Sequence, residues 1–182
     1  IKKQAQDAYA TAGLSQNEFL QGANKMGSLF QGAGFDVQTS MKMSGESMQR
    51  ASDIASIMGI STTDALEAVT GMAKGNFTMM DNLGVAMNDT AIGAYAASKG
   101  ITKSTQAMSI QEKVGLAQQM FMEKTAKYAG NYAKENETLS GSLNTTKKAF
   151  DNLLTGQGDI NGFITSLLNT IQIAIPQITA IL

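Results

Sequence analysis

The chain has 182 residues, with 14 basic and 15 acidic side chains and neither histidine nor cysteine. This composition excludes zinc sites built from histidine and thiolate, nucleophilic sites that rely on a histidine base, and disulfides. A net charge of −1 and a single arginine, Arg50, argue against specific nucleic-acid binding, which requires a basic face. The first residue is Ile1, and we expect the chain to be a section of a longer protein.

The overall pattern predicts an all-α fold, a compact bundle of about seven or eight helices. Pro176 is the only proline, so residues 1–175 are free of the residue that most disrupts helices. The 12 methionines favour helix and are expected mainly to fill the core. We expect residues 1–158 to form a helical domain, and residues 159–182 an apolar amphipathic helix that leads into the rest of a longer chain.

The first clear helix is predicted over residues 15–33, where Ser15 and Glu18 have the spacing of a capping box. The second is predicted over residues 44–58, with Ser44 and Ser47 as candidate N-caps. A second capping box, Ser109 with Glu112, opens the longest central helix. With glycines as the expected stops, the later helices are predicted over residues 65–75, 77–87 (short, interrupted by Gly84), 89–99, 110–132 and 139–154.

No catalytic, cofactor or metal site is predicted. Glu135 and Glu137 are two residues apart, so on a helix they would not share a face, and they suit a solvated loop. The glycines at 156–162 resemble neither a complete phosphate loop nor a complete calcium loop. We predict instead a turn between two helices that is capped by Asp159.

The segment 160–182 differs from the rest because it contains no charged residue. Its apolar residues recur at alternating steps of four and three, the spacing of a heptad seam. Three interpretations stay open: a membrane span, a helix docked on its own domain, and a self-associating helix. Pro176 is expected to kink the helix. The predicted partner-facing stripe consists of Ile160, Ile164, Leu167, Ile171, Ile178 and Ile181.

Two stretches of the chain resemble the tail tape measure proteins of long-tailed bacteriophages and prophages. Residues 51–89 contain short helices broken by an MGIS turn and followed by an LGVAM step. Residues 107–154 contain a QEK helix, a YAGNY turn, a TLSGSLN helix start and an AFDNL sequence. The likeness covers about half to three-quarters of the chain, and none of these strings is a catalytic signature.

The resemblance implies a structural virion component. Members of the family form a long helical rod inside the growing tail tube, and the length of the rod sets the tail length. Several copies lie side by side, contact tail tube and tail-tip proteins and tail assembly chaperones, and leave ahead of the DNA on infection. The implied location is the tail lumen, and the host cytoplasm during assembly.

Three hypotheses follow for this section of the chain. The first is a structural module that acts by packing and self-association, without catalysis. The second is a membrane-active segment in which residues 160–182 contact the bilayer during envelope penetration. The third is a peptidoglycan hydrolase, an activity that some members of the family carry in separate domains. The residues favour the first, because they offer apolar seams rather than reactive groups.

Overall fold

The computed structural model describes residues 1–135 and 138–179. Their secondary structure is entirely helical, which confirms the predicted all-α class, although the described helices outnumber the seven or eight expected. The 3-10 helices are η1 (Phe77–Leu83) and η2 (Ala126–Tyr128). The α-helices are α1 (Lys2–Gln6), α2 (Ala8–Thr11), α3 (Gln16–Gly32), α4 (Val37–Met58), α5 (Thr62–Ala73), α6 (Asp89–Ser98), α7 (Ile110–Lys124), α8 (Asn131–Glu135), α9 (Leu139–Leu154) and α10 (Ile160–Thr179).

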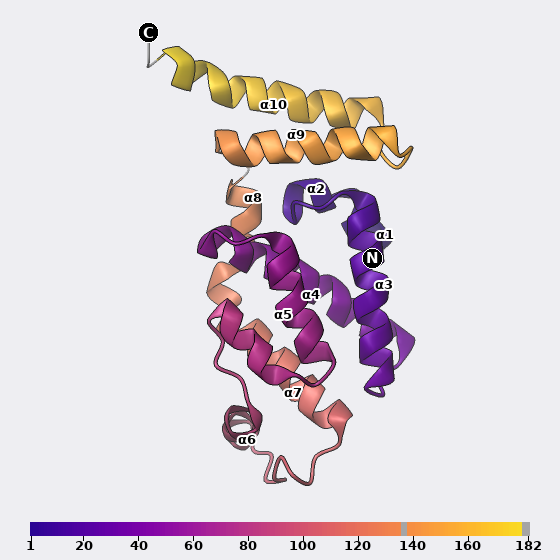
Figure 1. Ribbon diagram of the computed structural model, residues 1–182, viewed down its shortest axis with the longest axis vertical. Coiled ribbons are helices and arrows are strands. Elements are labelled where there is room, and N and C mark those ends of the chain that lie inside the picture. Colours follow the sequence, from indigo (N-terminus) through magenta and orange to yellow (C-terminus); the bar gives the residue numbers. More distant parts are fainter. Residues whose placement is uncertain (136–137, 180–182) are drawn as a thin grey trace.

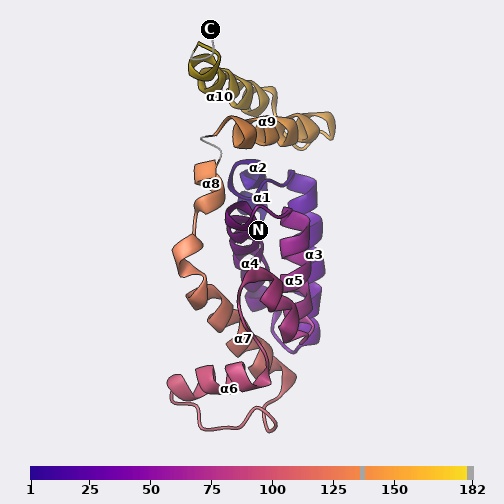
Figure 2. The same cartoon turned by 60° about the vertical axis from the view of Figure 1, so that its left-hand side comes forward.

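The molecule is elongated, with two unlike parts stacked along its long axis (Figure 1). Helices α1–α8 and η1 form the body, in which α3, α4 and α5 pack side by side. Helices α9 and α10 form an antiparallel hairpin across one end of the body, and α6 lies at the opposite end. Figure 2 shows the segment that contains α8 running along one side of the body from α7 to the hairpin.

Both predicted capping boxes are present. The Ser15 hydroxyl accepts a hydrogen bond from the backbone N–H of Glu18 (3.3 Å), and the Glu18 carboxylate accepts one from the backbone N–H of Ser15 (2.7 Å). Ser109 and Glu112 repeat this arrangement at the start of α7. Each box satisfies backbone donors that a helix start leaves unpaired, which explains why α3 and α7 begin where the sequence predicted.

The prediction for the second helix was wrong at its start. Helix α4 begins at Val37, and its N-cap is Asp36, whose carboxylate accepts a hydrogen bond from the backbone N–H of Thr39 (2.9 Å). Ser44 and Ser47 are buried inside the helix. Ser44 donates to the carbonyl oxygen of Ser40 (2.7 Å), a hydrogen bond within the helix that satisfies its hydroxyl without a cap.

The helix predicted over 110–132 is also divided. Helix α7 ends at Lys124. Gly130 adopts a left-handed conformation (φ 75°), which prevents a continuous helix into α8. The buried carboxylate of Asp53 accepts hydrogen bonds from the backbone N–H groups of Gly130 (2.9 Å) and Tyr132 (3.1 Å). Asp53 on α4 therefore fixes the start of α8 by a contact between residues far apart in sequence.

Alanine and methionine are the commonest residues in the core of the body. Fully buried large side chains include Phe30, Met72 and Phe121, which come from α3, α5 and α7. Most methionines are buried, as predicted, whereas Met58 at the end of α4 is exposed. Alanines on the facing helices let the backbones approach closely, and the flexible methionines fill the remaining space.

Candidate interaction surface on the α9–α10 hairpin

The hairpin is defined by a cap at the start of each helix. The Thr138 hydroxyl accepts a hydrogen bond from the backbone N–H of Gly141 (3.1 Å) at the start of α9. Asp159 accepts one from the backbone N–H of Gly162 (2.7 Å) at the start of α10. Residues 156–158 make the turn, so the predicted turn capped by Asp159 is confirmed.

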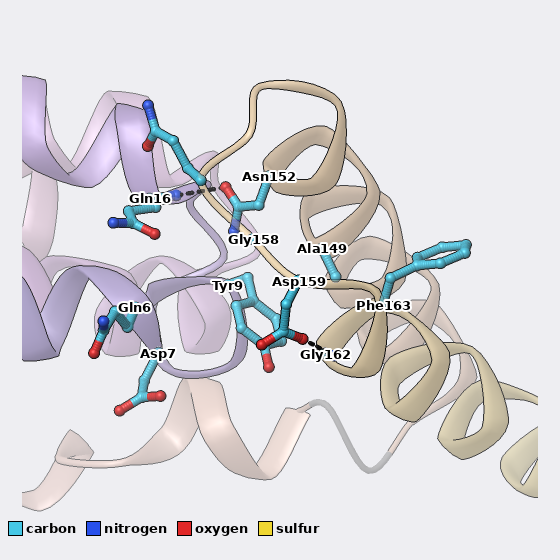
Figure 3. A pocket seen from close by; sticks show the side chains of 11 residues that line it. Gln6, Asp7, Tyr9, Gln16, Ala149, Asn152, Gly158, Asp159, Gly162 and Phe163 are labelled. Carbon is cyan, nitrogen blue, oxygen red and sulfur yellow. Dashed lines mark hydrogen bonds between the residues drawn. The ribbon is translucent and has the colours of Figure 1, made fainter.

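Polar contacts of described α9 residues join the hairpin to the body. The side-chain oxygen of Asn152 accepts a hydrogen bond from the backbone N–H of Gln16 (2.8 Å), as Figure 3 shows. Lys148 forms an ion pair with Glu18 (2.8 Å). Asn144 donates to the hydroxyl of the buried Tyr132 (2.8 Å). The three contacts are spaced along α9, so α9 rests on the body over much of its length.

Glu18 serves both the α3 cap and the hairpin joint. Partial burial raises the pKa of its carboxyl group, but hydrogen bonds from Lys148 and Ser15 outweigh that effect, and the net pKa is lowered. Glu18 therefore stays ionised and holds Lys148 against the body.

Helices α9 and α10 meet through hydroxyl groups and through an aromatic contact. The Thr146 hydroxyl lies 2.8 Å from the Thr170 hydroxyl and donates to the carbonyl oxygen of Ser166 (3.0 Å). Thr170 also donates to the carbonyl oxygen of Ser166 (3.1 Å), and both Ser166 and Thr170 are buried. At the end of the hairpin nearest the turn, the rings of Phe150 and Phe163 contact each other with centroids 5.3 Å apart.

The described residues of the predicted stripe on α10 are exposed. The exposed fractions are 55% for Ile160, 43% for Ile164, 39% for Leu167 and 44% for Ile171. A helix on the surface of a globular protein normally buries its apolar stripe and exposes its polar side. Helix α10 departs from this rule, because Ser166 and Thr170 are buried whereas the predicted stripe is exposed.

Four of the six stripe residues are thus brought together on one exposed side of α10. Leu168 and Ile175, which widen this side, are exposed as well. The side chain of Ile178 and the whole of Ile181 lie outside the described part of the chain. A role of the stripe in contacting a partner stays a prediction.

Of the three interpretations of this segment, the structure shows that α10 is docked on α9. None of the described helices combines the length and the hydropathy that crossing a membrane requires. The docking uses the polar side of α10, so it leaves the apolar stripe available to something else.

Helix α9 contributes to the same surface, which was not predicted from the sequence. Leu143, Phe150 and Leu154 are exposed, and at 100° per residue their spacing places them on one side of α9. The contact of Phe150 with Phe163 shows that this side adjoins α10. The spacings of seven and four residues between Leu143, Phe150 and Leu154 are the sequence signal for this apolar side of α9. We call the combined surface the hairpin face: Leu143, Phe150 and Leu154 of α9, with Ile160, Ile164, Leu167, Leu168, Ile171 and Ile175 of α10.

A polar pocket of about 370 Å³ lies where the hairpin turn meets the body (Figure 3). Two of its polar groups already have structural roles. Asn152 accepts a hydrogen bond from the backbone N–H of Gln16, and Asp159 accepts one from the backbone N–H of Gly162. In the described ranges, no group of three or more acidic, histidine or cysteine residues could hold a metal ion. Glu135 lines a different pocket, and Glu137 lies outside those ranges.

The chain matches no protein-family model, no curated protein and no solved structure. What the hairpin face binds is therefore inferred from its own chemistry.

Proposed function

We propose that the chain is a structural section of a bacteriophage or prophage tail tape measure protein. In this proposal it helps to set tail length during tail assembly, acts by packing without catalysis, and assists genome delivery. Its partners are other copies of itself, tail tube and tail-tip proteins and tail assembly chaperones. The observation that supports the proposal best is the uncharged apolar stripe exposed on α10.

The stripe is suited to association because it has no other structural use in the described chain. Burying a side chain of the size of Ile164 or Leu167 contributes about 1.5–3 kcal/mol relative to leaving it exposed. Contiguous exposed apolar patches on soluble proteins mark interaction sites. Copies of a tape measure protein lie side by side, so each copy would offer its neighbour such a surface.

The polar groups near the hairpin support a packing role as well. Asn152, Asp159 and Lys148 each bind a backbone or side-chain group of the same chain. They position α9 and α10 on the body, and by doing so they orient the stripe outward. A cell-wall clearing assay tests the competing enzyme hypothesis: lysis that is lost when one glutamate is replaced would contradict the proposal.

The direct test of the tape measure role is tail length in the phage or prophage that encodes the chain. An in-frame deletion of residues 1–182 should shorten the tails seen by electron microscopy, and an in-frame duplication should lengthen them. The duplication keeps the test valid if the deletion prevents assembly. Intact tails of unchanged length in both variants would contradict the proposed function.

The exposed stripe also supports the second hypothesis, a membrane-active segment. An apolar side of this kind can lie along a bilayer surface. Helix α10 has no lysine or arginine, however, so it gains no electrostatic attraction to anionic lipid. Co-flotation of the chain with liposomes, compared with an Ile164→Ser/Ile171→Ser variant, separates the two hypotheses. Flotation that depends on these two residues would favour the membrane role.

A further inference from the structure

We infer that the hairpin face packs on the hairpin face of a second copy of this chain, with α9 against α9 and α10 against α10 in antiparallel orientation. Two reciprocal ion pairs, Lys147 of one copy with Asp151 of the other, would join the α9 helices. This inference rests on the self-association in the proposed function and names the surface and geometry that accomplish it.

Helices α9 and α10 form one surface. The rings of Phe150 and Phe163 contact each other across the hairpin, which joins the exposed side of α9 to α10. Of the α9 residues in the hairpin face, Leu143 and Leu154 have the largest exposed fractions, 54% and 69%. A coiled coil made by α10 alone would leave Leu143 and Leu154 in water. A four-helix arrangement of two hairpins covers both helices.

Two opposite charges lie beside the apolar residues of α9. Lys147 lies four residues after Leu143 and three before Phe150, so it is on the apolar side of α9, and Asp151 is one turn further on. Within the described residues, no ion pair is found for Lys147 or Asp151, whereas the neighbouring Lys148 is paired with Glu18. Lys147 and Asp151 are thus two opposite charges at the edge of the hairpin face that are left for a partner.

The charge difference between α9 and α10 determines which helices face each other in the dimer. Helix α10 has no charged residue. If α9 packed on α10 of the second copy, Lys147 would face an uncharged helix and lose solvation without gaining a partner. Packing α9 on α9 gives each lysine an aspartate, and packing α10 on α10 matches two uncharged apolar stripes. Charge complementarity therefore selects a second copy as the occupant and like-with-like pairing as the geometry.

Two-fold symmetry completes the geometry. In an isologous contact, residue 147 can meet residue 151 of the second copy only if 151 also meets 147. Antiparallel α9 helices satisfy this condition when the two-fold axis passes near residue 149. A parallel pairing of α9 would place Lys147 beside Lys147, which is repulsive.

The test is a charge swap measured by sedimentation equilibrium of the full chain. We expect Lys147→Asp and Asp151→Lys, each alone, to weaken association about tenfold, because each variant places like charges together at two positions of the dimer. The double variant should return the affinity to near the original value. Lys25→Asp and Glu67→Lys, on exposed parts of the body, are matched controls that should leave association unchanged. Circular dichroism melts confirm that each variant is folded.

The outcomes separate this inference from the proposed function. Folded single variants that associate as tightly as the original chain would overturn the α9 pairing. A double variant no tighter than the single ones would do the same. In either case an Ile164→Ser/Ile171→Ser variant that dissociates would leave association through α10 intact. An original chain that stays monomeric would contradict both the inference and the self-association in the proposed function.

Discussion

The body and the hairpin use the same kind of amphipathic helix in opposite ways. In the body, α7 directs Val114 and Phe121 into the core, where both are fully buried. In the hairpin, α10 directs Ile164 and Ile171 outward and buries Thr170. Regular apolar spacing therefore identifies a helix and its stripe, whereas the direction of the stripe depends on what the opposite side of the helix can bind.

The two parts should also differ in what stabilises them. Large apolar side chains of the body lose contact with water on folding, the dominant favourable term in folding. The α9–α10 contact combines one aromatic pair with hydroxyl hydrogen bonds, each of which contributes a net of about 0.5–1.5 kcal/mol. We therefore expect the hairpin to open more readily than the body unfolds, until a partner covers its apolar face.

The largest expected effect is on the core of the body. Phe121→Ala removes a fully buried ring and should lower the free energy of unfolding by about 3–5 kcal/mol, because it loses the burial energy and leaves a cavity. Phe150→Ala, on the hairpin face, is the matched control and should cost less than about 1 kcal/mol. Urea denaturation measures both. Equal losses would show that the hairpin is as tightly integrated as the core.

The next effect concerns the buried polar contact of the body. Asp53→Asn should lower the free energy of unfolding by about 2–3 kcal/mol, because charged hydrogen bonds to Gly130 and Tyr132 are weakened and Arg50 loses its nearby carboxylate (4.0 Å). Glu67→Gln, at an exposed site, is the control. Thermal melts of the two variants test the difference, and a loss no greater than that of the control would refute the role given to Asp53.

A smaller effect is expected in the hairpin seam. Thr146→Val removes the hydroxyl that lies between Ser166 and Thr170 and should lower the free energy of opening of α10 by about 1 kcal/mol. Hydrogen exchange of the α10 amide groups measures this opening locally. Thr165→Val, on the exposed side of α10, should leave exchange nearly unchanged. Faster exchange throughout the body in Thr146→Val would show that the two parts do not open separately.

The smallest effect is the pH response of the body at the start of α7. The hydrogen bond from Lys103, with those from Ser109, lowers the pKa of Glu112 from 4.5 to about 2. Because the pKa is lower in the folded state, the ionised carboxylate stabilises the fold above about pH 4.5, and this contribution is lost as the pH falls towards about 2.

Thermal midpoints of the original chain and Glu112→Gln, compared from neutral pH down to acid, test this assignment. The original chain should be the more stable at neutral pH, and the gap should close as the pH falls. A gap that is constant with pH would contradict it. Helix α10 has no titratable side chain, so the same comparison should leave its amide exchange unaffected.

Structural features that depend on residues close together in the chain could be predicted from the sequence. The capping boxes at Ser15 and Ser109 and the cap at Asp159 follow from spacings of three residues, and all three are present. The spacing of the α10 stripe was also evident from the sequence, and the four described residues of the stripe share one exposed side.

The sequence alone did not predict features that depend on contacts between residues far apart in the chain. Ser44 looks like a cap because serine often is one, but the environment of α4 buries it. The break before α8 has a local signal in Gly130, but the contact that fixes the start of α8 comes from Asp53, which is 77 residues from Gly130 in the chain. The outward direction of the α10 stripe depends on Thr146 of α9, whose hydroxyl meets Ser166 and Thr170. Such contacts carry no local signal.

The central claim is that the exposed stripe of α10 binds another copy of the chain. Sedimentation equilibrium of the original chain and of Ile164→Ser/Ile171→Ser, over a range of concentrations, tests it most directly. We expect the original chain to show a mass above that of the monomer that rises with concentration, and the variant to remain a folded monomer. A monomeric original chain at every concentration, or a variant that associates equally well, would contradict the claim.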